Sequence, residues 1–450
     1  MLDSLGLEAI ISPAKPTTYK EHGLSPRTAV ASAGISNLSI AIPTEVWDIS
    51  GSISELAYLT HNFFRYYGKF PSTLAKNLIK EFAIPRYLIL DNYAGSGTTL
   101  VEAKLAGHNS FGIDVNPLGV LASKVKCRSY SIEILARRWA ELRTLLEEHF
   151  SFLLSTNDLL TEHSGLNYQE SRSQAKDCLS DSPKLDKWFT EKTLHDLAIV
   201  KSCILKLPPD DYREFFTLAF LAIIRRTSNA FDGEIRPHIN QDKKPRPVWK
   251  AFVKKVQEMI QREREWLTVT KPEVWGKAEI GDNRSLSSIT TPENQPVGMI
   301  VSHPPYLNSF DYLPIFSLEL EWSRDFLEVW GDYNTEKIRA METRAWPATQ
   351  DKIFNKYFED QRQVLGEARK VLVKGGRCCV VIGDATIHKD LVPVIKMTAE
   401  IGQDAGFDLE KIVYRTTHYG VGKYAYHHRA DYHNNENGKK DGVLIFRQPS

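Results

Sequence analysis

The feature of this sequence that most constrains its fold is a strand–turn–helix–strand unit near residue 100. Residues 87–91 (YLILD) form a short apolar run that ends in an acid, which is typical of a strand buried in a parallel sheet. A glycine-rich turn at 92–99 follows, and then a stretch that favours a helix. Residues 110–116 form a second strand-like run that contains Asp114. Because parallel strands need a crossover between them, the unit predicts an α/β protein with a mostly parallel, Rossmann-like sheet.

The same alternation of strands and helices returns after residue 276, and the last apolar run, 442–449, is expected to be an edge strand. The intervening stretch has apolar residues at helical spacing and predicts a largely helical insertion. We expect helices on both faces of the sheet. The predicted organisation is an N-terminal extension at 1–50, a cofactor-binding half of the core at 51–128, a helical insertion for target recognition at 129–275 and a catalytic half of the core at 276–450.

The composition excludes several classes of protein. Hydrophobic residues make up 42% of the 450 and charged residues 25%, which excludes a wholly disordered chain, and the net charge of +1 argues against a globally basic surface. No apolar run is long enough to cross a membrane, and the N-terminus lacks the pattern of a secretory signal. The five cysteines include no CxxC pair. We therefore expect a cytoplasmic protein without a membrane segment, a disulfide framework or a metal site.

The glycine-rich turn predicts a nucleotide-like ligand. Gly95 and Gly97 allow the backbone to turn sharply and a ligand to approach it closely. Asp114 ends the next strand, 23 residues after Asp91, and an acid there can hydrogen-bond both hydroxyls of a ribose. The turn is neither GxGxxG nor a P-loop, which disfavours nicotinamide and nucleotide-triphosphate ligands. The pattern suits an adenosine-containing cofactor, and a turn without a ligand is the alternative.

A second motif, Ser302-His303-Pro304-Pro305-Tyr306, directly follows another apolar strand. The two prolines fix the backbone and remove two N–H donors, so that carbonyl groups can point into a cleft as acceptors. The lone pair of an exocyclic amine is delocalised into its ring, so the amine reacts only when acceptors hold its hydrogens. A carbonyl, a side-chain acceptor and an aromatic platform at Tyr306 would provide this. The alternative is a plain strand-ending turn.

Together the two motifs resemble those of the amino-directed DNA methyltransferases, which use S-adenosylmethionine to methylate adenine N6 or cytosine N4. The segments 61–71 (HNFFRYYGKFP) and 281–284 (GDNR) are similar to further motifs of the family, and the resemblance covers roughly 51–128 and 276–450. The resemblance implies that the cofactor is bound by Lys69, Phe70, Pro71, Asp91, Tyr93, Gly95, Gly97, Thr98, Asp114 and Asp282. It implies that the target base is held by His303, Pro304, Pro305 and Tyr306.

The motif departs from the family pattern at His303, where the family has Asp, Asn or Ser. A neutral imidazole accepts one hydrogen bond and a protonated one accepts none, so we expect activity to require neutral His303 and to fall below its pKa. A weakened or inactive site is the alternative. The residue also leaves the choice between cytosine N4 and adenine N6 open. No cysteine follows a proline, so the nucleophile of cytosine C5 methylation is absent from the sequence.

The densest positive region of the chain runs from residue 225 to 255, with nine basic and three acidic residues. Such a region can neutralise DNA phosphates, and a solvated helix face is the alternative. A base inside a duplex cannot reach a cleft, so the target base would be flipped out. The candidate nucleic-acid-binding residues are Arg225, Arg226, Arg236, Lys243, Lys244 and Arg246.

Three functions follow from these motifs. The first is a site-specific DNA amino-methyltransferase of a bacterial defence or regulatory type, with duplex DNA as its partner. The second is an RNA methyltransferase that acts on an exocyclic amine, and the third is a nucleic-acid-binding homologue that has lost the chemistry. The sequence leaves open the recognition site, the oligomeric state and whether a cognate restriction endonuclease exists. A group of histidines, His418, His427, His428 and His433, matches no familiar metal site, and we expect it to be part of a polar loop.

Overall fold

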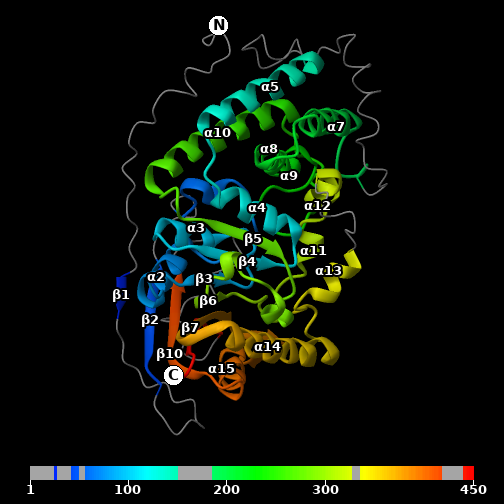
Figure 1. The fold of residues 1–450 in the computed structure, drawn as a ribbon. Coiled ribbons are helices and arrows are strands. Elements are labelled where there is room, and N and C mark those ends of the chain that lie inside the picture. The colour runs from blue at the N-terminus through cyan, green and yellow to red at the C-terminus, as the bar shows by residue number, and fades with distance from the viewer. Residues whose placement is uncertain (1–24, 28–41, 50–55, 151–184, 327–334, 418–438) are drawn as a thin grey trace.

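The computed structural model describes residues 25–27, 42–49, 56–150, 185–326, 335–417 and 439–450 (Figure 1). Within these residues the molecule is built around one sheet of nine strands in the order β1-β2-β10-β11-β7-β6-β3-β4-β5. The strands are β1 (Ser25–Arg27), β2 (Thr44–Ile49), β3 (Leu88–Asp91), β4 (Ser110–Asp114), β5 (Gly276–Ile280), β6 (Val297–Ser302), β7 (Leu372–Gly383), β10 (Asp408–Thr417) and β11 (Asp441–Arg447). Two short strands, β8 (Ala385–Ile387) and β9 (Asp390–Val392), form a separate hairpin.

The sheet is mostly parallel, as the sequence predicts. Strands β5, β4, β3, β6 and β7 pair in parallel, and so do β2 and β10. All four residues of β3 and all six of β6 are buried, which matches their continuous apolar runs. The chain thus has the predicted Rossmann-like α/β architecture, in which consecutive parallel strands end at the same edge of the sheet.

The prediction of an edge strand near the C-terminus is wrong. Strand β11 lies inside the sheet and pairs antiparallel with both β10 and β7. Six of its seven residues are buried, because its apolar side chains pack on both faces of the sheet. An apolar run without polar alternation indicates a strand covered on both faces, which is the environment of an interior strand.

Helices cover both faces of the sheet. One face packs against α2 (Ser72–Phe82) and against Ala103 of α3 (Thr98–Leu105). The other face packs against α14 (Asp351–Val371) and α15 (Val394–Asp404). Neighbouring strand residues divide between the two faces: Ile89 belongs to the first, and Leu88 and Leu90 to the second. This alternation follows from the two-residue period of a strand.

A helical layer lies at the top of Figure 1, above the sheet. It contains α5 (Ile132–Phe150), α7 (Glu191–Leu205), α8 (Asp211–Leu221), α9 (Ile224–Thr227) and α10 (Val248–Val269). Its core is continuous with α4 (Pro117–Cys127), which follows β4, and with α12 (Ser317–Ser323), which follows β6. Trp139 of α5 stacks on Phe216 of α8, and Phe220 of α8 packs edge-on against Trp322 of α12. The shared core ties the helical layer to segments that border the strand ends.

Shorter elements complete the described structure. They are η2 (Leu59–Asn62), η4 (Asn283–Ser288), η5 (Pro292–Asn294), α11 (Tyr312–Ile315), η6 (Arg324–Phe326) and α13 (Thr335–Met341). Strands β1 and β2, from the predicted N-terminal extension, add to the sheet beside β10. Among the described helices, none combines the length and the apolar character that a membrane crossing needs.

Candidate cofactor and catalytic site

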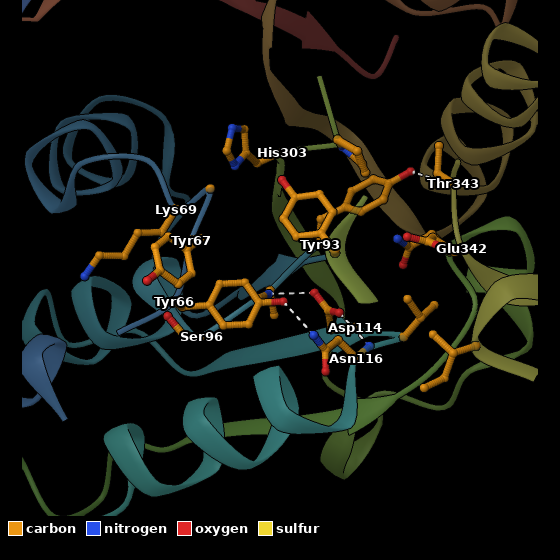
Figure 2. Close-up of a pocket in the computed structure, with 18 of the residues that line it drawn as sticks. Tyr66, Tyr67, Lys69, Tyr93, Ser96, Asp114, Asn116, His303, Glu342 and Thr343 are labelled. Carbon is orange, nitrogen blue, oxygen red and sulfur yellow. Dashed lines mark hydrogen bonds between the residues drawn. The ribbon is translucent and has the colours of Figure 1, made fainter. Parts of the chain in front are cut away.

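The carboxyl ends of β3, β4 and β6 meet at one pocket of about 830 Å³ (Figure 2). This is the edge at which ligands bind in open parallel sheets. The turn after β3 and the turn after β4 form its base, and the motif after β6 contributes His303 and Pro305. The lining residues are Tyr66, Tyr67, Gly68, Lys69, Phe70, Tyr93, Ala94, Gly95, Ser96, Thr98, Asp114, Val115, Asn116, Asn283, His303, Pro305, Tyr312, Leu313, Ile338, Met341, Glu342 and Thr343.

The glycine-rich turn needs both of its glycines. Gly95 and Gly97 have φ of +49° and +79°, a region that side chains other than hydrogen disfavour. A Cβ at Gly97 would also lie 3.0 Å from Cα of Ser123 in α4, so this glycine permits close packing of the turn on that helix. Gly95 lines the pocket, whereas Gly97 lies outside the lining and is the N-cap residue of α3.

Asp114 joins the two turns at the base of the pocket. Its Oδ2 accepts a hydrogen bond from the backbone N–H of Gly95 at 2.7 Å, and its Oδ1 accepts one from the N–H of Asn116 at 2.8 Å. Desolvation outweighs these two hydrogen bonds and raises the pKa of Asp114 to about 6. The carboxylate is thus held in a fixed orientation at the pocket, in the position that the sequence predicts for a ribose acceptor.

His303 lies at the opposite wall of the pocket (Figure 2). Its ring packs edge-on against Phe70, with centroids 5.1 Å apart, and against Tyr306, with centroids 5.3 Å apart. Desolvation and the positive charge of Arg415 lower the pKa of His303 to about 3. The imidazole is therefore neutral across the physiological range, which is the state that an acceptor requires. The loss of activity that we expect on protonation of His303 should therefore occur only in strongly acidic solution.

The three other predicted catalytic residues of the motif contact the surrounding core. The Pro305 carbonyl accepts a hydrogen bond from the Tyr357 hydroxyl at 2.9 Å. The Tyr306 hydroxyl donates to Asp441 at 2.8 Å and accepts from Arg415 at 2.8 Å. Pro304 is buried, and neither Pro304 nor Tyr306 is among the pocket-lining residues.

Four of the predicted cofactor-binding residues lie outside the pocket lining: Gly97, Asp91, Pro71 and Asp282. Asp91 is buried, accepts a hydrogen bond from the N–H of Tyr93 at 3.0 Å, and has its pKa raised to about 7 by burial. Pro71 is buried at the N-cap of α2. The Asp282 carboxylate pairs with Arg284 at 2.7 Å, and the next residue, Asn283, lines the pocket instead. The assigned roles of these residues therefore remain predictions.

One wall of the pocket is not predicted from the sequence. Residues 338–343, at the end of α13, bring Ile338, Met341, Glu342 and Thr343 to the pocket. The Tyr93 and Thr343 hydroxyls are 3.0 Å apart, which ties this wall to the glycine-rich turn. No recognisable motif marks this segment, since its contribution depends on how the chain folds back after α12. The aromatic pair Tyr66 and Tyr67 lies within the 61–71 segment and could have been assigned from it.

Two buried polar atoms of the pocket residues find no hydrogen-bond partner within the described part of the chain. They are Oγ of Ser96 and Oδ1 of Asn283. Buried polar atoms in folded proteins are almost always paired, so these two atoms are available to a polar ligand in the pocket. The pocket thus offers two polar side chains, a fixed carboxylate at Asp114 and aromatic walls, which together suit a nucleoside.

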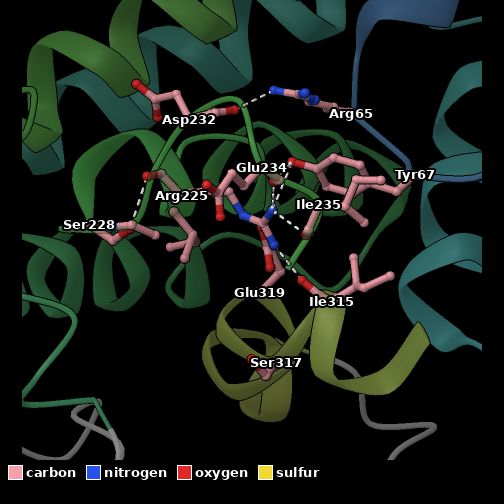
Figure 3. Close-up of polar contacts among 12 residues, drawn as sticks. Arg65, Tyr67, Arg225, Ser228, Asp232, Glu234, Ile235, Ile315, Ser317 and Glu319 are labelled. Carbon is pink, nitrogen blue, oxygen red and sulfur yellow. Dashed lines mark hydrogen bonds and ion pairs between the residues drawn. The ribbon is translucent and has the colours of Figure 1, made fainter. Parts of the chain in front are cut away.

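Two of the six predicted nucleic-acid-binding residues, Arg225 and Lys243, make hydrogen bonds inside the protein, and Figure 3 shows those of Arg225. Arg225 is 7% exposed, and its Nη1 donates to the Tyr67 hydroxyl at 2.7 Å and to the carbonyls of Glu234 and Ile235. Its Nη2 donates to the carbonyl of Ile315. Nζ of Lys243 donates to the carbonyls of Arg225 and Ala230. We therefore correct the assignment of Arg225 and Lys243 from phosphate contacts to internal supports of the loop that follows α9.

The other four residues are placed differently. Arg226, Lys244 and Arg246 are exposed, and the guanidinium of Arg236 lies 4.5 Å from the ring centroid of Trp346. The loop that carries them touches the pocket wall through the Tyr67 hydroxyl, which donates to the Glu234 carbonyl at 3.1 Å. The exposed cations therefore lie on α9 and on the loop that follows it, which borders the pocket. The histidines at 418, 427, 428 and 433 lie outside the described residues.

Comparison with known proteins agrees with this geometry. The fold and the pocket define a Rossmann-like α/β protein with a pocket at its strand ends. Residues 17–124 match the N6/N4 methylase family model, which is described as a DNA methylase. This segment of the chain is similar to the N6/N4 methylase family, and the curated proteins that resemble the chain are type II methyltransferases matched over part of their length.

Two of these relatives show the extent of the similarity. The type II methyltransferase M.MvaI of Kocuria varians is 31% identical over 185 residues, which is 40% of this chain and 36% of that protein. M.BsoBI of Geobacillus stearothermophilus is 38% identical over 109 residues, 23% of this chain and 21% of that protein. The matched regions thus span about a third or less of these relatives. Among solved structures, TrmN from Thermus thermophilus aligns over 85% of this chain and 50% of its own, with 10% identity and a TM-score of 0.29.

Proposed function

We propose that the protein is a site-specific DNA methyltransferase that transfers a methyl group from S-adenosylmethionine to an exocyclic amine, cytosine N4 or adenine N6, of a flipped-out base. The observation that carries this proposal is the single pocket that the glycine-rich turn shares with His303 and Pro305. A methyl donor bound against Gly95 and Asp114 would face the motif that holds the target amine. The family match and the type II relatives support DNA as the substrate.

The chain has residues that suit the cofactor. The Asp114 carboxylate would accept hydrogen bonds from the ribose hydroxyls, and Asn283 and Ser96 would pair their unsatisfied atoms with polar groups of the cofactor. Tyr66 and Phe70 would contribute apolar walls. When bound, S-adenosylmethionine supplies an electrophilic methyl group on a positively charged sulfur.

His303 would act as a hydrogen-bond acceptor for the target amine. Because its imidazole is neutral, one ring nitrogen has a lone pair that can accept an amine N–H, and the adjacent Pro304 carbonyl would accept the other. These two contacts orient the nitrogen lone pair toward the methyl group for an in-line displacement. The low pKa of His303 makes it too weak a base to keep the proton that the methylated amine releases, so that proton passes to solvent.

DNA would approach over the loop that borders the pocket. The exposed side chains of Arg226, Lys244 and Arg246 would contact phosphates, and the adjacent Arg236 would reach the same backbone. A duplex base must leave the stack to enter the pocket. Since the relatives are type II methyltransferases, we place the protein in the cytoplasm as part of a modification system, and a cognate restriction endonuclease is the partner to search for.

A methyl-transfer assay tests this proposal. The protein is incubated with S-adenosylmethionine labelled with tritium in its methyl group and with either DNA amplified in vitro, which carries no methyl groups, or unmodified tRNA. We expect label in DNA alone, and a fall of about 100-fold or more for His303→Ala, since an acceptor of the reacting amine is lost. His108→Ala, at a histidine outside the pocket lining, is the matched control and should retain full activity.

Each other outcome has a defined meaning. Label in tRNA alone would make the protein an RNA methyltransferase, and label in neither would favour a binding protein without the chemistry. Long-read sequencing of DNA from cells that express the wild type or His303→Ala then identifies both the methylated base and its sequence context.

A further inference from the structure

Two charged residues lie against the catalytic motif although neither belongs to it. Arg415 is near the end of β10, and Asp441 is the first residue of β11, the antiparallel neighbour of β10. Their side chains are 7% and 5% exposed. Nε of Arg415 donates to Oδ1 of Asp441 at 2.7 Å, and its Nη2 donates to Oδ2 at 2.7 Å. This is a two-pronged, buried ion pair of the kind that fixes geometry most strictly.

The pair holds the Tyr306 hydroxyl from both sides. The hydroxyl donates to Oδ1 of Asp441 at 2.8 Å and accepts from Nη2 of Arg415 at 2.8 Å. The three polar groups therefore form a triangle of hydrogen bonds in which each one contacts the other two. These charge-assisted hydrogen bonds fix the position of the tyrosine hydroxyl, whereas the plane of the ring is set by its packing, because the hydroxyl lies on the axis about which the ring turns.

The ring of Tyr306 is also confined at Gly383, the last residue of β7. A Cβ at Gly383 would lie 2.9 Å from Cε2 of Tyr306, so the ring occupies the space that a side chain would fill. Its edge packs against His303 at a centroid distance of 5.3 Å. The tyrosine ring is thus fixed by contacts at its hydroxyl, at Gly383 and at His303.

We propose that Arg415 and Asp441 are positioning residues of the catalytic motif, which lock Tyr306 by its hydroxyl so that its ring is a preformed platform for the target base. This inference rests on the proposed methyl transfer and assigns a role in it to residues outside both sequence motifs. A platform fixed before the base arrives reduces the ordering cost of the reactive complex, so its loss appears in the rate of the chemical step.

The arrangement also affects His303. The charge of Arg415 is one of the two causes of the low pKa of His303, the other being desolvation. Other titratable groups also lie near His303. Asp441 is paired with Arg415 and with the Tyr306 hydroxyl, and the same pocket is lined by Tyr66, Tyr67, Lys69, Tyr93, Asp114, Tyr312 and Glu342. Removal of the Arg415 charge should raise the pKa of His303. Removal of the Tyr306 hydroxyl leaves that charge in place, so the pKa of His303 should stay low.

The test compares three single variants and one double variant in single-turnover methyl transfer to DNA amplified in vitro. Tyr306→Phe keeps the ring and the ion pair and removes only the link between them. Arg415→Met removes the link and the charge. Each should slow transfer about tenfold, the typical effect of losing a hydrogen bond to a charged group. Arg377→Met, on neighbouring β7 and also paired with a carboxylate, Glu410, is the matched control and should be unchanged.

The double variant Tyr306→Phe/Arg415→Met distinguishes positioning from general structural support. If both residues act through one anchor, the double variant is no slower than the slower single variant. The acid limb of the pH–rate profile should move to higher pH in the two variants that lack Arg415 and should stay in place in Tyr306→Phe. Cofactor affinity and the melting temperature of Tyr306→Phe should match the wild type.

Two results would overturn the inference on different grounds. A wild type that transfers no methyl group to DNA removes the proposed function and this role with it. If the wild type is active, unchanged single-turnover rates in Tyr306→Phe would contradict the anchor role. Fully additive losses in the double variant would contradict it too, and in both cases the proposed methyltransferase function would stand.

Discussion

The glycine-rich turn and the basic loop after α9 were both predicted from sequence to contact a ligand, and the structure treats them differently. Gly95 and Ser96 of the turn reach the pocket, as does Asp114 of β4, which accepts a hydrogen bond from the N–H of Gly95. Arg225, in α9, and Lys243, in the loop after it, instead make hydrogen bonds inside the protein. The turn is placed by topology, since parallel strands end at one edge of the sheet. Charge along a loop has no such constraint, so a count of basic residues does not show which of them face solvent.

The neighbours Arg225 and Arg226 are expected to give the largest difference between an internal and an exposed cation. Arg225→Met should lower the free energy of unfolding by about 3–5 kcal/mol, because it strands Glu319 and several carbonyls that the guanidinium pairs. Arg226→Met, at the adjacent exposed residue, should change stability by less than about 0.5 kcal/mol. Urea unfolding followed by circular dichroism measures the stability of both variants. Equal unfolding midpoints would contradict the internal role of Arg225.

The Asp114 carboxylate tests the other member of the comparison. Asp114→Asn should weaken S-adenosylmethionine binding about 10- to 100-fold, the loss of a charge-assisted hydrogen-bond pair. Since the pKa of Asp114 is raised to about 6, wild-type affinity should be constant above that pH and fall as the carboxylate takes up a proton below it. Calorimetry from pH 5 to 8 checks this. The Asn variant should show no such dependence, and an identical pH profile in both proteins would contradict the role.

The exposed cations should have a smaller and different effect. Ala substitutions at Arg226, Lys244 and Arg246 should each weaken DNA binding several-fold and reduce the slope of log affinity against log salt concentration by about one. Binding to labelled duplexes at several salt concentrations measures the slopes. Lys277→Ala, at a basic residue on β5, is the control and should keep the wild-type slope. Slopes unchanged in all three variants would place the DNA elsewhere.

The smallest expected effect concerns His303. Its pKa of about 3 lies far below that of an exposed histidine, so its protonation should cause no decline in the transfer rate between pH 5 and 8. The sign follows from burial and from Arg415, which both disfavour the charged imidazole. The pH dependence of single-turnover rates at saturating cofactor measures this. A steep fall of the transfer rate below about pH 6.5 that disappears in His303→Asn would contradict the low pKa and would show that His303 titrates as a solvated histidine.

The sequence predicts the sheet and the base of the site well, because both depend on local patterns. Apolar runs identify β3, β4 and β6, and the turn after each strand carries its motif. The errors arise where long-range packing decides. Strand β11 reads as an edge but pairs on both sides, and the wall at 338–343 reaches the pocket only because the chain folds back over it. Likewise, Asp282 is drawn to Arg284, while its neighbour Asn283 faces the pocket.

A crystal structure with S-adenosylhomocysteine, the product left after methyl transfer, examines the shared pocket itself. We expect the ribose of S-adenosylhomocysteine at Asp114, its polar groups in contact with Ser96 and Asn283, and its sulfur directed toward His303 and Pro305. A product bound outside this pocket, or one whose sulfur points away from His303, would contradict the proposed site.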